Sequence, residues 1–139
     1  MTNTQSTDST PSLLFPALRY RDARAAIAFL VDVLGFTEAA VYGEGERVDH
    51  AELVRASGGA VMLGSAREDS TIAGLPPGVG AVYVAVGQGE LTRLHDRARE
   101  AGARIVEPLR DEDYGGQGFT CLDPEGVHWS FGTYRGHGG

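Results

Sequence analysis

Three side chains of this sequence could transfer protons or bind a metal ion: His50, Glu52 and His128. His50 and Glu52 are two residues apart in a stretch suited to a strand, so both face the same side of it. Histidine exchanges protons near neutral pH and can form an acid/base pair with a carboxylate. The three side chains could also form a displaced metal site. The simpler alternative is that they are exposed or make local hydrogen bonds.

Arg19 is close to the end of the first predicted strand. Its guanidinium could bind a carboxylate or oxyanion of a ligand. A salt bridge at the strand end is the alternative, and it is the role that we expect.

Three other sites have simpler predicted roles. Cys121 lies in an apolar strand and is expected to be an inert core residue. The sequence DPEG, from Asp123 to Gly126, is typical of a turn. GGQG, from Gly115 to Gly118, lacks the lysine of a phosphate-binding loop, so we predict that it forms a mobile flap with Tyr114.

Two segments have the apolar periodicity of amphipathic helices. The first runs from Ala23 to Leu34, with Asp22 as its N-cap and Gly35 after its end. The second runs from Glu90 to Ala101 and is ended by Gly102. Eight stretches are suited to strands: Leu13 to Tyr20, Glu38 to Tyr42, Asp49 to Arg55, Ala60 to Gly64, Ala81 to Val86, Arg104 to Glu107, Gly118 to Leu122 and His128 to Tyr134.

The order of one strand, one helix and three strands occurs twice in the sequence. We therefore predict an α+β fold of two βαβββ modules in a single domain, residues 13–134. Module one is expected at 13–66, a linker with two adjacent prolines at 67–79, and module two at 80–134. Residues 1–12 are expected to be a disordered polar tail, and 135–139 a short C-terminal tail.

The composition of the chain excludes some partners. With 139 residues and a net charge of −7, the chain is an acidic protein, for which nucleic acid and anionic membranes are unfavourable partners. No apolar run approaches the ~20 residues that span a bilayer. A single cysteine and a start without a secretory signal favour the cytoplasm.

The doubled pattern resembles a known superfamily. LRYRDARAAIAFLVDVLGF (Leu18 to Phe36), VYVAVGQGELTRLHDRAREAGARIVEP (Val82 to Pro108) and DPEGVHWSFGTY (Asp123 to Tyr134) are similar to the vicinal oxygen chelate superfamily, which has the glyoxalase, bleomycin-resistance and extradiol dioxygenase fold. This resemblance implies a curved mixed sheet around a cleft, with the helices on the outer face. It also implies a homodimer.

Metal-dependent members of that superfamily hold the ion with four strand residues, usually His, Gln or Glu. The matching positions here are Phe15, Met62, Ala81 and Ser130. Phenyl and methyl groups donate nothing to a divalent cation, and a thioether or a neutral hydroxyl is a weak ligand. The resemblance therefore implies a metal-free member without a cofactor.

Strand alternation turns one set of side chains toward the cleft, and the ligand-binding residues named below belong to it, except Tyr114 of the flap. The alternate side chains, which we expect to face the helices, are Leu18, Tyr20, Val82, Val84, Trp129 and Phe131. We expect an aromatic, thioether and hydroxyl lining of this kind to bind a planar organic molecule. The predicted function is sequestration of a planar drug or metabolite by a metal-independent binding protein. The alternative is a cofactor-free isomerase, cyclase or lyase that uses His50, Glu52, His128 or Tyr83. The predicted ligand-binding residues are Phe15, Ala17, Met62, Ala81, Tyr83, Tyr114, His128 and Ser130.

Overall fold

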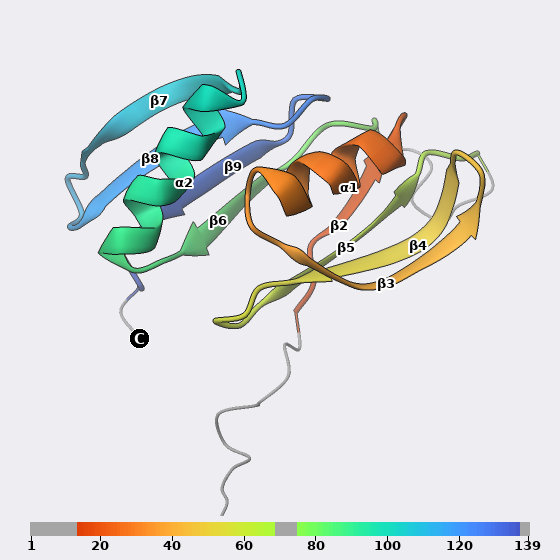
Figure 1. The fold of residues 1–139 in the computed structure, drawn as a ribbon, viewed down its shortest axis with the longest axis horizontal. Coiled ribbons are helices and arrows are strands. Elements are labelled where there is room, and N and C mark those ends of the chain that lie inside the picture. Colours follow the sequence, from red (N-terminus) through yellow and green to blue (C-terminus); the bar gives the residue numbers. More distant parts are fainter. Residues whose placement is uncertain (1–13, 69–74, 137–139) are drawn as a thin grey trace, which may run out of the picture.

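The computed structural model describes residues 14–68 and 75–136. The predicted N-terminal tail at 1–12, part of the predicted linker and the last three residues lie outside this described part of the chain. Figure 1 shows two similar halves side by side, each with one helix in front of one sheet.

Module one contains five elements, which form one sheet and one helix. The sheet has the order β2-β5-β4-β3, in which β2 pairs with β5 in parallel and the other pairs are antiparallel. The elements are β2 (Ala17–Tyr20), α1 (Ala23–Asp32), β3 (Thr37–Glu44), β4 (Arg47–Val54) and β5 (Ala60–Ser65).

Module two repeats this arrangement. Its sheet has the order β6-β9-β8-β7, again with the first strand of the module parallel to the last one. The elements are β6 (Ala81–Ala85), α2 (Gln88–Glu100), β7 (Arg104–Asp111), β8 (Gln117–Leu122) and β9 (His128–Gly132). The predicted α+β class and the two βαβββ modules are therefore confirmed, and the strands divide into two four-stranded sheets.

The helix ends follow the predicted capping residues, with small shifts of the bounds. The Asp22 carboxylate accepts a hydrogen bond from the backbone N–H of Ala25 at 3.0 Å, so Asp22 is the N-cap of α1. α1 ends before the predicted Leu34, because the Leu34 N–H bonds to the Phe29 carbonyl five residues back. Gly35 then takes a φ of 82°, which favours glycine. α2 starts slightly before the predicted Glu90, with Gly87 as its N-cap.

Two strand bounds differ from the prediction for reasons that involve proline. β2 begins at Ala17, so Phe15 precedes the strand and was wrongly placed within it. Pro16 has no N–H to donate to a ladder, although its carbonyl accepts from Met62 N at 2.9 Å. β7 continues past Glu107 to Asp111 because it is an edge strand, where Pro108 is tolerated.

The core lies between the sheets and the two helices. The side chains predicted to face the helices are buried at Leu18, Tyr20, Trp129 and Phe131, and Val82 and Val84 pack against the same cluster. Neither helix of the described residues has the length and apolar character needed to cross a membrane.

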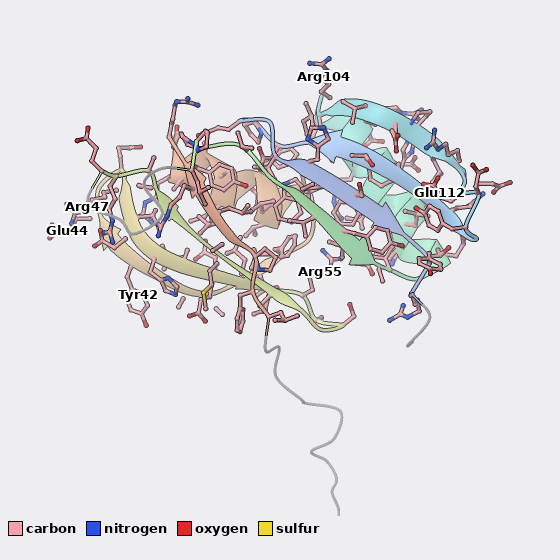
Figure 2. The ribbon with its side chains drawn as sticks, turned by 180° about the vertical axis from the view of Figure 1, so that it is seen from behind. Tyr42, Glu44, Arg47, Arg55, Arg104 and Glu112 are labelled. Atoms are coloured by element: carbon pink, nitrogen blue, oxygen red, sulfur yellow. The ribbon has the colours of Figure 1, made fainter. Side chains whose placement is uncertain are left out.

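Arg55 joins the two modules through this core. Its side chain, 5% exposed, donates to the Leu34 carbonyl at 2.8 Å and to the Glu90 carboxylate of α2. The guanidinium also lies over the rings of Phe36 and Phe131, at 5.1 and 5.8 Å from their centroids. Figure 2 shows Arg55 between the modules. Because its partners come from both modules, Arg55 fixes how they sit relative to each other.

Candidate functional site

A row of four side chains crosses the face of module two that points away from α2. The strand register places Tyr83 opposite Ser130, Ser130 opposite Thr120, and Thr120 opposite Glu107. The hydroxyls of Thr120 and Ser130 are 2.7 Å apart and share a hydrogen bond. This row lines a cavity of about 260 Å³. It combines an aromatic ring, two hydroxyls and a carboxylate on one surface.

Three tyrosines form a second hollow beside this row. The Tyr83 hydroxyl donates to the backbone carbonyl of Tyr134 at 2.6 Å, and the Tyr114 ring meets the Tyr134 ring edge-on at 4.9 Å. Together with Ala85 and Arg135 they line a cavity of about 530 Å³. Tyr114 therefore lines this hollow, and its part in a mobile flap stays a prediction.

The chemistry of Tyr83 favours binding over proton transfer. Burial, and then the neighbouring Tyr114, raise the pKa of Tyr83 above its usual value. The phenol is therefore protonated at neutral pH, as an ordinary tyrosine is, and its proton is already donated to the Tyr134 carbonyl. Tyr83 is thus poorly suited to be a general base and well suited to offer an aromatic face.

Acidic groups border the module-two face. Arg110 lies 3.4 Å from Glu107 and 3.3 Å from Glu112, so it bridges the two carboxylates. Desolvation, and then Glu112, raise the pKa of the Tyr114 phenol. Glu112 is seen at the end of module two in Figure 2.

The corresponding face of module one has a different composition. A row of Ala17, Met62, Glu52 and Ala40 crosses it. The His50 ring bonds to the Glu52 carboxylate at 2.9 Å, and the Tyr42 ring stacks on His50 at 6.4 Å. This hydrogen bond fits both the acid/base pair and the local hydrogen bond that the sequence left open, so a catalytic role of His50 and Glu52 stays a prediction.

Arg19 lies on this same face, two residues along β2 from Ala17. It is on the same side of the row as His50, which is two residues along β4 from Glu52. The register pairs Arg19 with Gly64, and no salt bridge of Arg19 occurs among residues 14–68 and 75–136. The predicted salt bridge at the strand end is thus wrong for the described residues.

The predicted site residues divide between the two modules. Ala17 and Met62 lie on the module-one face, with Phe15 just before it and 39% exposed. The second group, on module two, is Ala81, Tyr83, Tyr114, His128 and Ser130. Within the described residues no hydrogen bond, ion pair or ring contact joins His128 to His50 or Glu52. The structure therefore pairs His50 with Glu52 and leaves His128 apart from them.

The donor set does not fit a divalent cation. In the part of the chain that the structure describes, no group of three or more His, Cys, Asp or Glu side chains is placed to hold one. Ser130 bonds to Thr120, and Met62 lies between Ala17 and Glu52. A neutral hydroxyl and a thioether on different modules are weak and separate ligands. No chemistry routed through a metal follows from these residues.

Two other candidate residues have structural roles. The Asp123 carboxylate, 4% exposed, accepts from the backbone N–H groups of Glu125, Gly126 and Val127, and so holds the predicted turn. Cys121 is fully buried, and burial raises the pKa of its thiol to about 11. Both agree with the sequence-based expectation of a turn and an inert core thiol.

Sequence reasoning missed several residues of the module-two face: Thr120, Glu107, Glu112 and Tyr134. Alternation along the predicted strand from Gly118 to Leu122 could have placed Thr120, because it is two residues from Leu122. Glu107 was treated as a strand end, and nothing in the local sequence indicated that β7 continues.

The chain matches a family model over most of its length. The model described as the Glyoxalase/Bleomycin resistance protein/Dioxygenase superfamily matches residues 12–131. The chain belongs to this superfamily. The resemblance drawn from its sequence motifs is therefore confirmed.

Individual relatives cover most of the chain. An uncharacterized protein of Mycobacterium bovis, Mb0911c, is 31% identical over 129 residues, which cover 86% of this chain and 81% of that protein. Among solved structures, TioX from Micromonospora sp. ML1 is 30% identical with a TM-score of 0.67, covering 87% of this chain and 94% of TioX.

A more distant structure shares the fold alone. The fosfomycin resistance protein FosX from Listeria monocytogenes, in a complex with Mn(II) and a dihydroxypropylphosphonic acid, is 13% identical with a TM-score of 0.64. The match covers 89% of this chain and 93% of FosX.

Proposed function

We propose that this superfamily member is a metal-independent binding protein that sequesters a planar drug or metabolite in the cytoplasm. The row of Tyr83, Ser130, Thr120 and Glu107 is the observation that carries the proposal. A flat ring can stack on Tyr83 while the paired hydroxyls of Ser130 and Thr120 orient its polar edge. The Tyr83 hydroxyl donates to the Tyr134 carbonyl, so the ring face of Tyr83 is the part of the side chain that a ligand would contact.

We further propose that two chains form a homodimer whose modules enclose the ligand. Figure 2 shows the strands of both modules in front of their helices, so both inner faces point to the same side of the chain. Tyr42, Tyr83 and Tyr114 are 62%, 45% and 56% exposed on the single chain. A second chain would cover these rings and give a ligand a second wall. Sedimentation at micromolar concentration should show a dimer, and a monomer that binds ligand would contradict this part of the proposal.

A neutral planar probe tests the binding function. β-Naphthamide has a flat apolar body and an amide that can bond to the hydroxyls of Ser130 and Thr120. Isothermal titration should show saturable binding, and chromatography with mass spectrometry should return the probe unchanged. Tyr83→Ala should weaken binding, whereas Tyr42→Ala in module one serves as a matched tyrosine control whose effect should be smaller.

The hydrogen bond between His50 and Glu52 favours one alternative, a cofactor-free isomerase, cyclase or lyase. In that alternative His128 or Tyr83 of a second chain would complete the acid/base set. A conversion of any ligand that is abolished by Glu52→Gln or His128→Ala, with affinity unchanged, would establish the enzyme and contradict simple sequestration.

A further inference from the structure

Arg19 is a half-buried cation for which the structure supplies no anion. Its Nε is inaccessible to solvent and has no hydrogen-bond partner among the described residues. A buried polar group without a partner has lost its hydration and gained nothing in exchange. In native proteins most buried polar groups are hydrogen-bonded, which points to a partner for Arg19 outside the single chain.

The other shielded arginines differ from Arg19 because each has at least one hydrogen-bond partner. Within residues 14–68 and 75–136, only Arg19, Arg24 and Arg55 are not exposed. Arg24 donates to the Gly45 carbonyl at 3.0 Å, and Arg55 donates to Leu34 and Glu90. The Nε of Arg55 is also buried without a hydrogen-bond partner, but Nη1 and Nη2 of Arg55 both donate. Among these three arginines of the described residues, Arg19 is the one whose guanidinium makes no hydrogen bond or ion pair at any nitrogen.

Gly64 makes room for the Arg19 side chain on the inner face. A Cβ at position 64 would lie 2.4 Å from the Arg19 Nη1, which is closer than atoms can approach. The guanidinium therefore lies across β5, over the space that a side chain of residue 64 would fill. Gly64 has no positive φ, so the backbone there does not require glycine. The missing side chain allows Arg19 to lie flat on the face.

The surroundings of Arg19 define a small polar end of the module-one face. His50 and its partner Glu52 lie on β4, and Tyr42 stacks on His50 from β3. Next to them, the side chains of Ala17 and Met62 form an apolar surface. Glu52 is bonded to His50, and no hydrogen bond or ion pair joins it to Arg19 in the described residues, so the Arg19 guanidinium can still donate to an anion. An anion with an apolar body matches both parts.

We propose that Arg19 binds the carboxylate of the ligand, so that the molecules held by this protein are planar organic acids. The proposal rests on the binding function proposed above and adds the charge class of its ligand. The planar guanidinium donates paired hydrogen bonds whose spacing fits a carboxylate. In the proposed dimer, the apolar body of the acid then lies between Met62 and Ala17 on one side and the Tyr83 ring of the second chain on the other.

Three probes of nearly equal shape test the charge class: β-naphthoate, β-naphthamide and β-naphthylmethylammonium. Wild-type protein should bind β-naphthoate about tenfold more tightly than the neutral amide, and the ammonium compound most weakly. Arg19→Gln should bring β-naphthoate to within about twofold of β-naphthamide, while the affinity for the amide stays unchanged. Titration calorimetry measures all three dissociation constants under one set of conditions.

Two control variants separate binding by the Arg19 side chain from an effect of the net charge of the protein. Arg21→Gln removes the same charge two residues away, where the side chain is exposed, and should preserve the preference for β-naphthoate. Gly64→Ala keeps the charge of Arg19 but moves its guanidinium, so it should reduce the preference. Circular dichroism confirms that each variant is folded.

Several results would overturn the proposal. Equal binding of all three probes by the wild type would contradict the charge class and leave the binding function intact. If Arg19→Gln kept the preference for β-naphthoate but self-associated more weakly, Arg19 would instead pair with a carboxylate of a second chain. If the wild type bound none of the probes, the binding function itself would fail, and this inference with it.

Discussion

The Tyr20 hydroxyl of module one donates to the Asp123 carboxylate of module two over 2.5 Å. The same oxygen of Asp123 accepts from the Trp129 indole at 3.0 Å. Both residues are buried, and burial together with the Asp123 carboxylate raises the pKa of Tyr20 far above its usual value. The turn that follows β8 is thereby tied to the first strand of the other module.

Removal of this hydroxyl should destabilise the fold without changing the ligand faces. Tyr20→Phe leaves the charged Asp123 oxygen with one donor fewer, so we expect the free energy of unfolding to fall by about 1–3 kcal/mol. Urea denaturation followed by Trp129 fluorescence measures the change. Tyr42→Phe, at an exposed ring, is the control and should change stability by less than about 0.5 kcal/mol. Equal losses of unfolding free energy in the two variants would show that the hydrogen bond to Asp123 does not stabilise the fold.

Arg55 should contribute more to stability than any exposed arginine. Arg55→Ala leaves the Leu34 carbonyl without its donor and uncovers two aromatic rings, so we expect a loss of about 2–4 kcal/mol. Glu90→Gln should cost only about 1 kcal/mol or less, because the Glu90 side chain is 34% exposed and solvent screens its charge. Chemical denaturation of both variants, with exposed Arg47→Ala as control, checks this order. A larger loss for Glu90→Gln than for Arg55→Ala would contradict it.

The Cys121 thiol should make stability depend on alkaline pH. Burial raises its pKa from 9.0 to about 11, so the native state holds this proton where the unfolded state has lost it. Stability from this group is present below about pH 9 and falls as pH rises to about 11. The difference in unfolding free energy between wild type and Cys121→Ala should therefore shrink over that interval. A constant difference would mean that the thiol titrates alike in both states.

The aromatic wall should dominate binding of a planar probe. Tyr83→Ala should weaken the affinity for β-naphthamide by roughly tenfold to a hundredfold, because a stacked ring contributes about 1–3 kcal/mol. Phe15→Ala should have a smaller effect than the sequence suggests, since Phe15 lies outside β2. His128→Ala should cost about 1 kcal/mol, the value of one orienting hydrogen bond. Titration calorimetry ranks the three variants, and His128 ranking first would contradict the stacking account.

Much of the fold could be predicted because its signals are local. Helical periodicity, the Asp22 cap, the glycines after both helices and the DPEG turn each depend on a few neighbouring residues. Alternation within strands likewise assigned Leu18, Tyr20, Trp129 and Phe131 to the core correctly.

The parts that were missed depend on how distant segments meet. The state of Arg19 follows from its pairing with Gly64, and the register of β2 on β5 is not visible in either segment alone. The extension of β7 through Pro108 depends on its edge position, which the sheet order decides. In β4, the pairing of Tyr42 with His50 and of Gly43 with Val48 leaves Asp49 as an extra residue, a bulge without a sequence signal.

Metal-independent binding is the central claim, and one titration tests it most directly. Protein treated with EDTA and dialysed should bind β-naphthamide with a dissociation constant within about twofold of the value measured with added Mn²⁺ or Zn²⁺. The probe should be recovered chemically unchanged from both samples. Binding that appears only after a divalent metal is added, or conversion of the probe in either sample, would contradict the claim.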